Sequence, residues 1–176
     1  QAQVFTAMAV SEQGAVHTFW LDTRGMTEST RAALYYRRSD DGGARFEEEV
    51  RLQENDQCPC CQVSAVTGGQ SSLFVSARQI TGDNIRTPTV MHSDDSGASF
   101  GAPAETGGTP WRLEGCPLKL TAMATTPDTI HSLVHNGAED PPGLLYARAA
   151  QRDMSFLPPQ KIHPEAAVSD SPAMAS

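Results

Sequence analysis

The chain has 176 residues, of which 21 are acidic and 13 basic, so its formal net charge is −8. With 39% hydrophobic and 19% charged residues it is too apolar for a disordered chain, and 14 glycines and 12 prolines make it too turn-rich for a helical bundle. The acidic balance excludes nucleic acid as an expected partner, and no apolar run approaches the roughly 20 residues that span a bilayer.

Short apolar or alternating runs, separated by Gly, Asp, Asn, Ser and Pro, predict β-strands along the whole chain. In chain order the predicted strands cover residues 4–10, 15–21, 33–38 and 48–52, then 62–67, 72–77 and 87–92, and finally 118–124, 129–134, 144–148 and 159–162. No apolar pattern with helical spacing lasts for three turns. The sequence therefore predicts an all-β chain.

A short motif, Ser-x-Asp-x-Gly-x-x-Phe, follows the third strand of each of the first two groups. Its residues are Ser39, Asp41, Gly43 and Phe46 in the first copy, and Ser93, Asp95, Gly97 and Phe100 in the second. The two copies lie 54 residues apart, and a degraded third copy ends 56 residues later at Phe156. The Asp can accept backbone N–H groups, the Gly can adopt positive φ, and we expect the Phe to tuck under the sheet. These residues are therefore predicted to form turns rather than to act as catalytic carboxylates.

A period of about 55 residues holding four antiparallel strands is typical of one blade of a β-propeller. We expect one partial propeller over residues 1–176, with blades at about 1–53, 57–107 and 115–163 and the start of another at 165–176. Three blades cannot close a ring, so further blades of the same protein, or another protein subunit, are expected to complete it. We expect six blades in the complete propeller.

The two motifs resemble the Asp boxes of sialidase-like, BNR-repeat β-propellers, and the resemblance covers nearly the whole chain. Two cysteine segments add a narrower resemblance. Cys58-Pro59-Cys60-Cys61 and the later Gly115-Cys116-Pro117 are similar to motifs of a bacterial group of exported sialidase-like proteins. The resemblance implies a sialidase-like fold and a periplasmic or extracellular location.

Sialidases hold the substrate carboxylate with three arginines and use a Tyr–Glu pair and an Asp for catalysis. The Phe/Tyr-Arg-Ile-Pro segment that usually carries the first arginine does not occur in this sequence, and the candidate arginines are Arg24, Arg78, Arg86 and Arg112. We therefore assign no catalytic residue and expect a non-catalytic binding or scaffold module. We picture it as a subunit of a larger cell-envelope assembly, with at most peripheral membrane association. An exo-sialidase-type glycoside hydrolase, with its active site in further blades, is the alternative.

The four cysteines fall at equivalent places in the repeat. Cys58, Cys60 and Cys61 precede the predicted inner strand of one blade, and Cys116 precedes that of the next. Inner strands of neighbouring blades run side by side, so the four should lie close together. In an exported protein an even number of cysteines favours disulfides, and one to Cys116 would join two blades. The alternative is a zinc or copper site, because Cys58-x-x-Cys61 has zinc-type spacing and clustered thiolates suit Cu(I). No other cofactor is expected.

Trp111, close to Cys116, is the better of the two tryptophans as a candidate for a binding surface. The histidines fall on predicted strands. His131 and His135 share one strand face but stand about 13 Å apart. We expect them to be packed or solvated residues rather than metal ligands.

Overall fold

The computed structural model describes residues 3–69, 71–139 and 142–163, and these residues form β-strands and no helix. The first four strands are β1 (Gln3–Val10), β2 (Val16–Asp22), β3 (Ala32–Ser39) and β4 (Val50–Gln57). The next four are β5 (Ser64–Gly68), β6 (Ser72–Thr81), β7 (Ile85–Ser93) and β8 (Ala104–Glu105). The last four are β9 (Ala122–Thr126), β10 (Thr129–Asn136), β11 (Gly143–Ala150) and β12 (Gln160–His163). The all-β prediction is confirmed.

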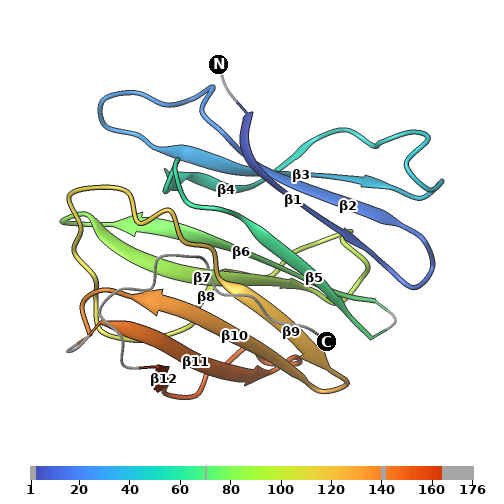
Figure 1. Cartoon of the computed structure of the whole chain (residues 1–176). Coiled ribbons are helices and arrows are strands. Elements are labelled where there is room, and N and C mark those ends of the chain that lie inside the picture. Colours follow the sequence, from blue (N-terminus) through green and yellow to red (C-terminus); the bar gives the residue numbers. More distant parts are fainter. Residues whose placement is uncertain (1–2, 70, 140–141, 164–176) are drawn as a thin grey trace.

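Each group of four strands pairs antiparallel in chain order, and we call the groups the first, second and third sheets. A single pair, Gln57 with Gln79, connects the first two sheets at one edge. Figure 1 shows the sheets stacked in succession, from β1–β4 through β5–β8 to β9–β12. The innermost strands β1, β5 and β9 lie side by side, which is the arrangement of neighbouring propeller blades.

The second sheet is buried on both faces. Three consecutive residues of β6, Leu73, Phe74 and Val75, are 1%, 0% and 1% exposed. Neighbouring residues of a strand point to opposite faces, so each face of this sheet must be covered. Leu73 and Val75 pack in a core that includes Phe19 of the first sheet, and Phe74 packs in one that includes Ile130 of the third. Packing between sheets therefore holds the three groups together.

The predicted inner strand at residues 118–124 starts too early, since β9 begins only at Ala122. Leu118 has a φ of 53°, which is outside the range of an extended strand. The segment before β9 instead runs along the edge of the second sheet, where Ile85 pairs with Arg112. The predicted blade start at residues 165–176 lies outside the described residues.

The turns after β3 and β7 share one hydrogen-bond pattern. In the second copy the Ser93 hydroxyl donates to Asp95 at 2.7 Å and accepts the Gly97 N–H at 2.8 Å, while Asp95 accepts the Ser99 N–H at 2.9 Å. The first copy repeats these contacts among Ser39, Asp41, Gly43 and Arg45. Gly43 and Gly97 both have positive φ, at 94° and 87°. Each motif thus closes the turn after a third strand.

The phenylalanines of the motifs differ in burial. Phe100 packs on the first sheet, with its ring centroid 6.1 Å from that of Phe19 and 5.2 Å from that of Tyr36. Phe156 likewise packs against the core that includes Phe74. Phe46 is 40% exposed, so the expectation that it tucks under the sheet is wrong. The reason is that Phe100 and Phe156 each pack on the preceding sheet, and in the described residues no sheet precedes the first.

Candidate functional site

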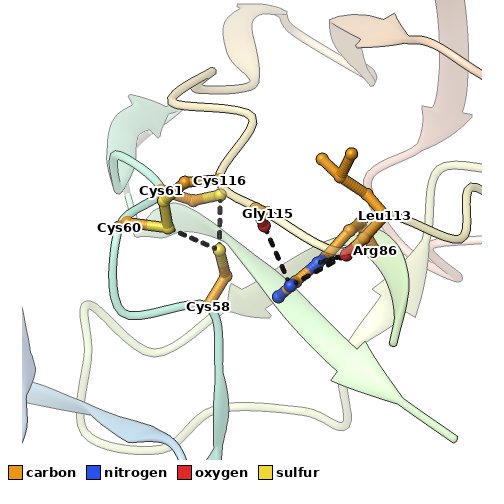
Figure 2. Close-up of a disulfide and its surroundings, with 7 residues drawn as sticks. All are labelled: Cys58, Cys60, Cys61, Arg86, Leu113, Gly115 and Cys116. Carbon is orange, nitrogen blue, oxygen red and sulfur yellow. Dashed lines mark hydrogen bonds between the residues drawn. A yellow bond between two sulfur atoms is a disulfide. The ribbon is translucent and has the colours of Figure 1, made fainter. Parts of the chain in front are cut away.

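The four cysteines meet where the chain enters β5 and approaches β9, and we call them the cysteine site. Cys60 and Cys116 form a disulfide with their Cα atoms 6.1 Å apart (Figure 2). It joins the connection between β4 of the first sheet and β5 of the second to the segment that leads into the third sheet. The expectation of a disulfide from Cys116 to one of the three other cysteines is confirmed, and the partner is Cys60.

Cys58 and Cys61 are free thiols, and both are buried, at 0% and 1% exposure. Their Sγ atoms are 2.7 Å apart, and Cys58 Sγ is 3.5 Å from Cys60 Sγ. The backbone brings them together, because the Cys61 N–H donates to the Cys58 carbonyl at 3.2 Å and the Cys58 N–H to the Arg78 carbonyl at 2.7 Å. The tight turn of the Cys58-x-x-Cys61 segment therefore places a dithiol directly beside the disulfide.

Charge is distributed unequally over the two thiols. The hydrogen bond from Cys61, the backbone N–H of Cys60 and the nearby Arg86 and Arg78 together lower the pKa of Cys58 to about 6. The same hydrogen bond and burial raise the pKa of Cys61. Burial also lowers the pKa of the Arg78 guanidinium, while the neighbouring cysteines oppose this by favouring its charged form. These contacts therefore favour negative charge on Cys58 rather than on Cys61.

Arg86 holds the segment that carries Cys116. Its guanidinium Nη2 donates to the Leu113 carbonyl at 3.1 Å and to the Gly115 carbonyl at 3.0 Å (Figure 2). Its backbone N–H donates to the Trp111 carbonyl at 2.8 Å. The segment is therefore fixed to the start of β7 by contacts that do not depend on the disulfide.

Trp111 packs beside the cysteine site, against residues of the second and third sheets. Its ring meets that of His135 edge-on, with centroids 5.6 Å apart, and the Arg78 guanidinium lies 5.7 Å from its ring centroid. Trp111 also lines a cavity of about 200 Å³ with Arg86 and Asn136, and Glu105 is the one carboxylate among the described residues that line it. This cavity offers no pair of carboxylates for glycosidic bond cleavage.

The four candidate arginines of a carboxylate clamp have other partners. Arg24 forms ion pairs with Asp22 and Glu49 of the first sheet. Arg112 is exposed and lies 3.6 Å from a carboxylate oxygen of Glu114. The remaining two, Arg78 and Arg86, are buried beside the cysteines. The structure therefore does not bring the four guanidinium groups together around one open cavity.

A second group of interest lies on the face of the first sheet that meets the second. His17 Nδ1 and the Tyr36 hydroxyl are 2.8 Å apart, and the Arg38 guanidinium donates to the Ser96 carbonyl at 3.0 Å. A Cβ added to Gly97 would overlap the Tyr36 hydroxyl. We call His17, Tyr36 and Arg38 the first trio. It receives the Asp-box turn of the following sheet.

The third sheet repeats this group. His131 Nδ1 and the Tyr146 hydroxyl are 2.7 Å apart, and both His–Tyr pairs have ring centroids 6.0 Å apart. His131 pairs with Arg148 across β10 and β11, as His17 does with Arg38 across β2 and β3. His131, Tyr146 and Arg148 form the second trio, which lies on the face of the third sheet that points away from the second. Sequence analysis missed both trios because it treated each histidine singly. The signal was a repeated Tyr-x-Arg on the strand after each His.

The second sheet has no such trio. Phe74 stacks on His92 there, with ring centroids 4.4 Å apart. The motif that packs over this face is the degraded copy ending at Phe156. An intact Asp box therefore faces a trio, and a degraded one faces a sheet that lacks it.

No protein-family model matches the chain, and neither does any curated protein. Solved structures do match, and they place the chain in the class of β-propellers. A Hadza microbial sialidase, Hz136, matches 90% of this chain and 33% of its own, with 16% identity and a TM-score of 0.61. The α-L-arabinofuranosidase Arb93A of Fusarium graminearum, solved with an iminosugar inhibitor, matches 93% of this chain and 49% of its own, with 12% identity and a TM-score of 0.64. A protein of unknown function from Dyadobacter fermentans matches 88% and 53%, with 10% identity and a TM-score of 0.55.

The chain thus has the fold of part of a sialidase-like or arabinofuranosidase-like β-propeller, as the sequence predicts. It spans a third to about half of the length of these solved structures. At such identities the likeness concerns the fold alone. The described residues include no helix that could cross a membrane.

Proposed function

We propose that this chain is part of a non-catalytic, sialidase-like β-propeller that acts as a binding or scaffold module. The observation that carries the proposal is the second trio. It repeats, on an outer face, the surface that in the first sheet receives an Asp-box turn. The chain therefore presents a face shaped to receive one more blade.

The occupant we propose for this face is a blade with an intact Asp box, from the same protein or from another subunit. Arg148 is exposed, whereas its counterpart Arg38 binds the Ser96 carbonyl of such a turn. Tyr146 stands where Tyr36 meets Gly97. The greater length of the matched solved structures also supports further blades.

The absence of catalysis in this part is supported by what its arginines do. A sialidase clamp needs guanidinium groups that are open to a substrate carboxylate. Arg86 instead binds backbone carbonyls, and Arg78 is enclosed beside Cys58 and Cys61. Both guanidinium groups therefore bind backbone carbonyls of this chain, Arg78 that of Arg86 and Arg86 those of Leu113 and Gly115.

The test is hydrolysis of a fluorogenic sialoside and a fluorogenic α-L-arabinofuranoside by the natural protein that contains this chain. We expect no release of fluorophore above a protein-free control. Release that persists through purification would overturn the proposal in favour of a glycoside hydrolase.

We further propose an exported location and a role in a cell-envelope assembly. A disulfide between two sheets supports this, since such bonds persist in oxidising compartments. Fractionation of cells that carry a tagged natural protein tests the location. We expect the tag in the periplasmic or extracellular fraction, associated with other envelope proteins. A cytoplasmic signal with four reduced thiols would contradict it.

A further inference from the structure

The cysteine site has a chemistry that a scaffold does not need, because a buried dithiol lies against a disulfide. We propose that the cysteine site is a thiol–disulfide exchange site. In it the Cys58/Cys61 dithiol delivers two electrons, through the Cys60–Cys116 disulfide, to a small disulfide substrate at the surface. This inference stands independently of the proposed scaffold function.

The geometry orders the four sulfurs from the interior to the surface. Cys61 and Cys58 are buried, Cys60 is half-buried and Cys116 is exposed. Cys58 Sγ lies 2.7 Å from Cys61 Sγ and 3.5 Å from Cys60 Sγ (Figure 2). One sulfur, Cys58, therefore contacts both the other free thiol and the disulfide.

Exchange proceeds in two displacements. First, the Cys58 thiolate attacks Cys60 Sγ, so a Cys58–Cys60 bond forms, the Cys60–Cys116 bond breaks, and Cys116 leaves as a thiolate. Second, Cys61 loses its proton and attacks Cys58 Sγ, which forms a Cys58–Cys61 bond and releases Cys60 as a thiolate. The buried pair is oxidised and the outer pair reduced by two electrons. Cys60 takes up the proton that Cys61 loses, and the negative charge passes from Cys58 to Cys116.

The surroundings favour this direction of attack. The hydrogen bond from Cys61 favours the thiolate of Cys58 over that of Cys61, and the charges of Arg78 and Arg86 favour a thiolate at either sulfur. Arg86 also holds the Cys116 segment through the carbonyls of Leu113 and Gly115. Cys60 and Cys116 therefore stay close together after the bond between them opens.

The substrate is a disulfide of small thiols, since Cys116 is the one exposed residue among the four cysteines. The Cys116 thiolate attacks this disulfide, forms a mixed disulfide and releases one small thiolate. Cys60 then attacks Cys116 Sγ, releases the second small thiolate and re-forms Cys60–Cys116. The external disulfide becomes two thiols at the expense of the buried dithiol, which an external dithiol reductant must restore.

The test starts from protein brought to one disulfide per chain with limiting reductant, and maps thiols by alkylation under native conditions and peptide mass spectrometry. In the wild type, which starts with the Cys60–Cys116 bond of the structure, we expect exchange to give a fraction of chains with a Cys58–Cys61 bond and alkylated Cys60 and Cys116. Cys61→Ser should trap the Cys58–Cys60 bond with Cys116 alkylated. Cys58→Ser is the matched control, in which Cys60–Cys116 should stay intact and Cys116 unlabelled.

A second readout uses glutathione disulfide as the probe. Fully reduced wild-type protein should re-form Cys60–Cys116 first and Cys58–Cys61 second, consuming two equivalents per chain. The Cys58→Ser variant should consume one equivalent of glutathione disulfide per chain. Wild-type protein in which no chain carries a Cys58–Cys61 or Cys58–Cys60 bond would overturn the proposal. So would four reduced thiols that bind one zinc or copper ion per chain, which indicates a metal site.

Discussion

Two glycines of the Asp boxes have the same backbone conformation but different neighbours. Gly43 and Gly97 both have positive φ, yet a Cβ at Gly43 meets no atom within 4 Å, whereas one at Gly97 overlaps Tyr36. Substitutions at these two glycines therefore separate the cost of backbone strain from the cost of disturbing the contact between sheets.

We predict that Gly43→Ala lowers the free energy of unfolding by about 1–2 kcal/mol, which is the cost of a left-handed alanine. Gly97→Ala should lose a further 1–3 kcal/mol or so, because the new methyl group displaces Tyr36 from the first trio. Urea unfolding of both variants measures the difference. Equal losses would contradict a tight contact at Gly97.

The carboxyl of Asp95 predicts a pH effect. Hydrogen bonds from the Ser99 hydroxyl and N–H and from the Ser93 hydroxyl lower its pKa to about 2. The stability it contributes is fully present above its unfolded pKa and is lost as the pH falls toward 2. Because Asp95 is exposed, we expect a loss below about 1 kcal/mol. Comparison of urea unfolding at pH 5 and pH 2.5 should show a smaller loss in Asp95→Asn than in the wild type.

At the scale of elements, the segment before β9 is held to the second sheet in two ways. The disulfide closes 56 residues of sequence, and Arg86 binds the Leu113 and Gly115 carbonyls. Loss of the disulfide in Cys116→Ser should lower the free energy of unfolding by about 2–4 kcal/mol.

Arg86→Gln should remove the hydrogen bonds to the Leu113 and Gly115 carbonyls, at a cost of about 1–3 kcal/mol. It should speed hydrogen exchange in residues 106–121. Arg112→Gln is the matched control, since Arg112 is 67% exposed in its side chain and should change exchange little. Equal effects of the two changes would mean that Arg86 does not anchor the segment.

Alternation of apolar residues and the spacing of turns were enough to predict most strands of the three sheets. The segment around Leu118 could not be predicted, because its positive φ and its attachment to Arg86 depend on residues some 30 positions away. The sequence placed the four cysteines together through the repeat, but their pairing depends on the turn at Cys58–Cys61. Nothing in the sequence around Arg78 and Arg86 indicates their roles, since both occur in ordinary strand patterns.

At the scale of the molecule, the chain is a stack in which each sheet covers the face of the one before it. The middle sheet is buried on both faces, whereas the second trio lies on an outer face. The period of the sequence predicts the propeller. It does not reveal the second trio, because His131, Tyr146 and Arg148 come together only when the register of β10 and β11 places them on one side of the sheet.

If a further blade docks at this face, substitutions of the residues that bind it should destabilise the natural protein. Arg148→Ala should destabilise it about as much as Arg38→Ala, by roughly 1–3 kcal/mol, because each arginine would bind a carbonyl of an Asp-box turn. Arg152→Ala, at an exposed position outside the trio, is the control and should have little effect. Thermal unfolding of the three variants measures this. A neutral Arg148→Ala would argue against docking.

The most direct measurement is an experimental structure of the natural protein that contains this chain. The observation that matters is which residues contact Tyr146. We predict that the Tyr146 hydroxyl lies against the glycine of an intact Asp-box turn, with Arg148 bound to a carbonyl of the same turn. A Tyr146 that faces solvent, or a cover without an Asp box, would contradict it.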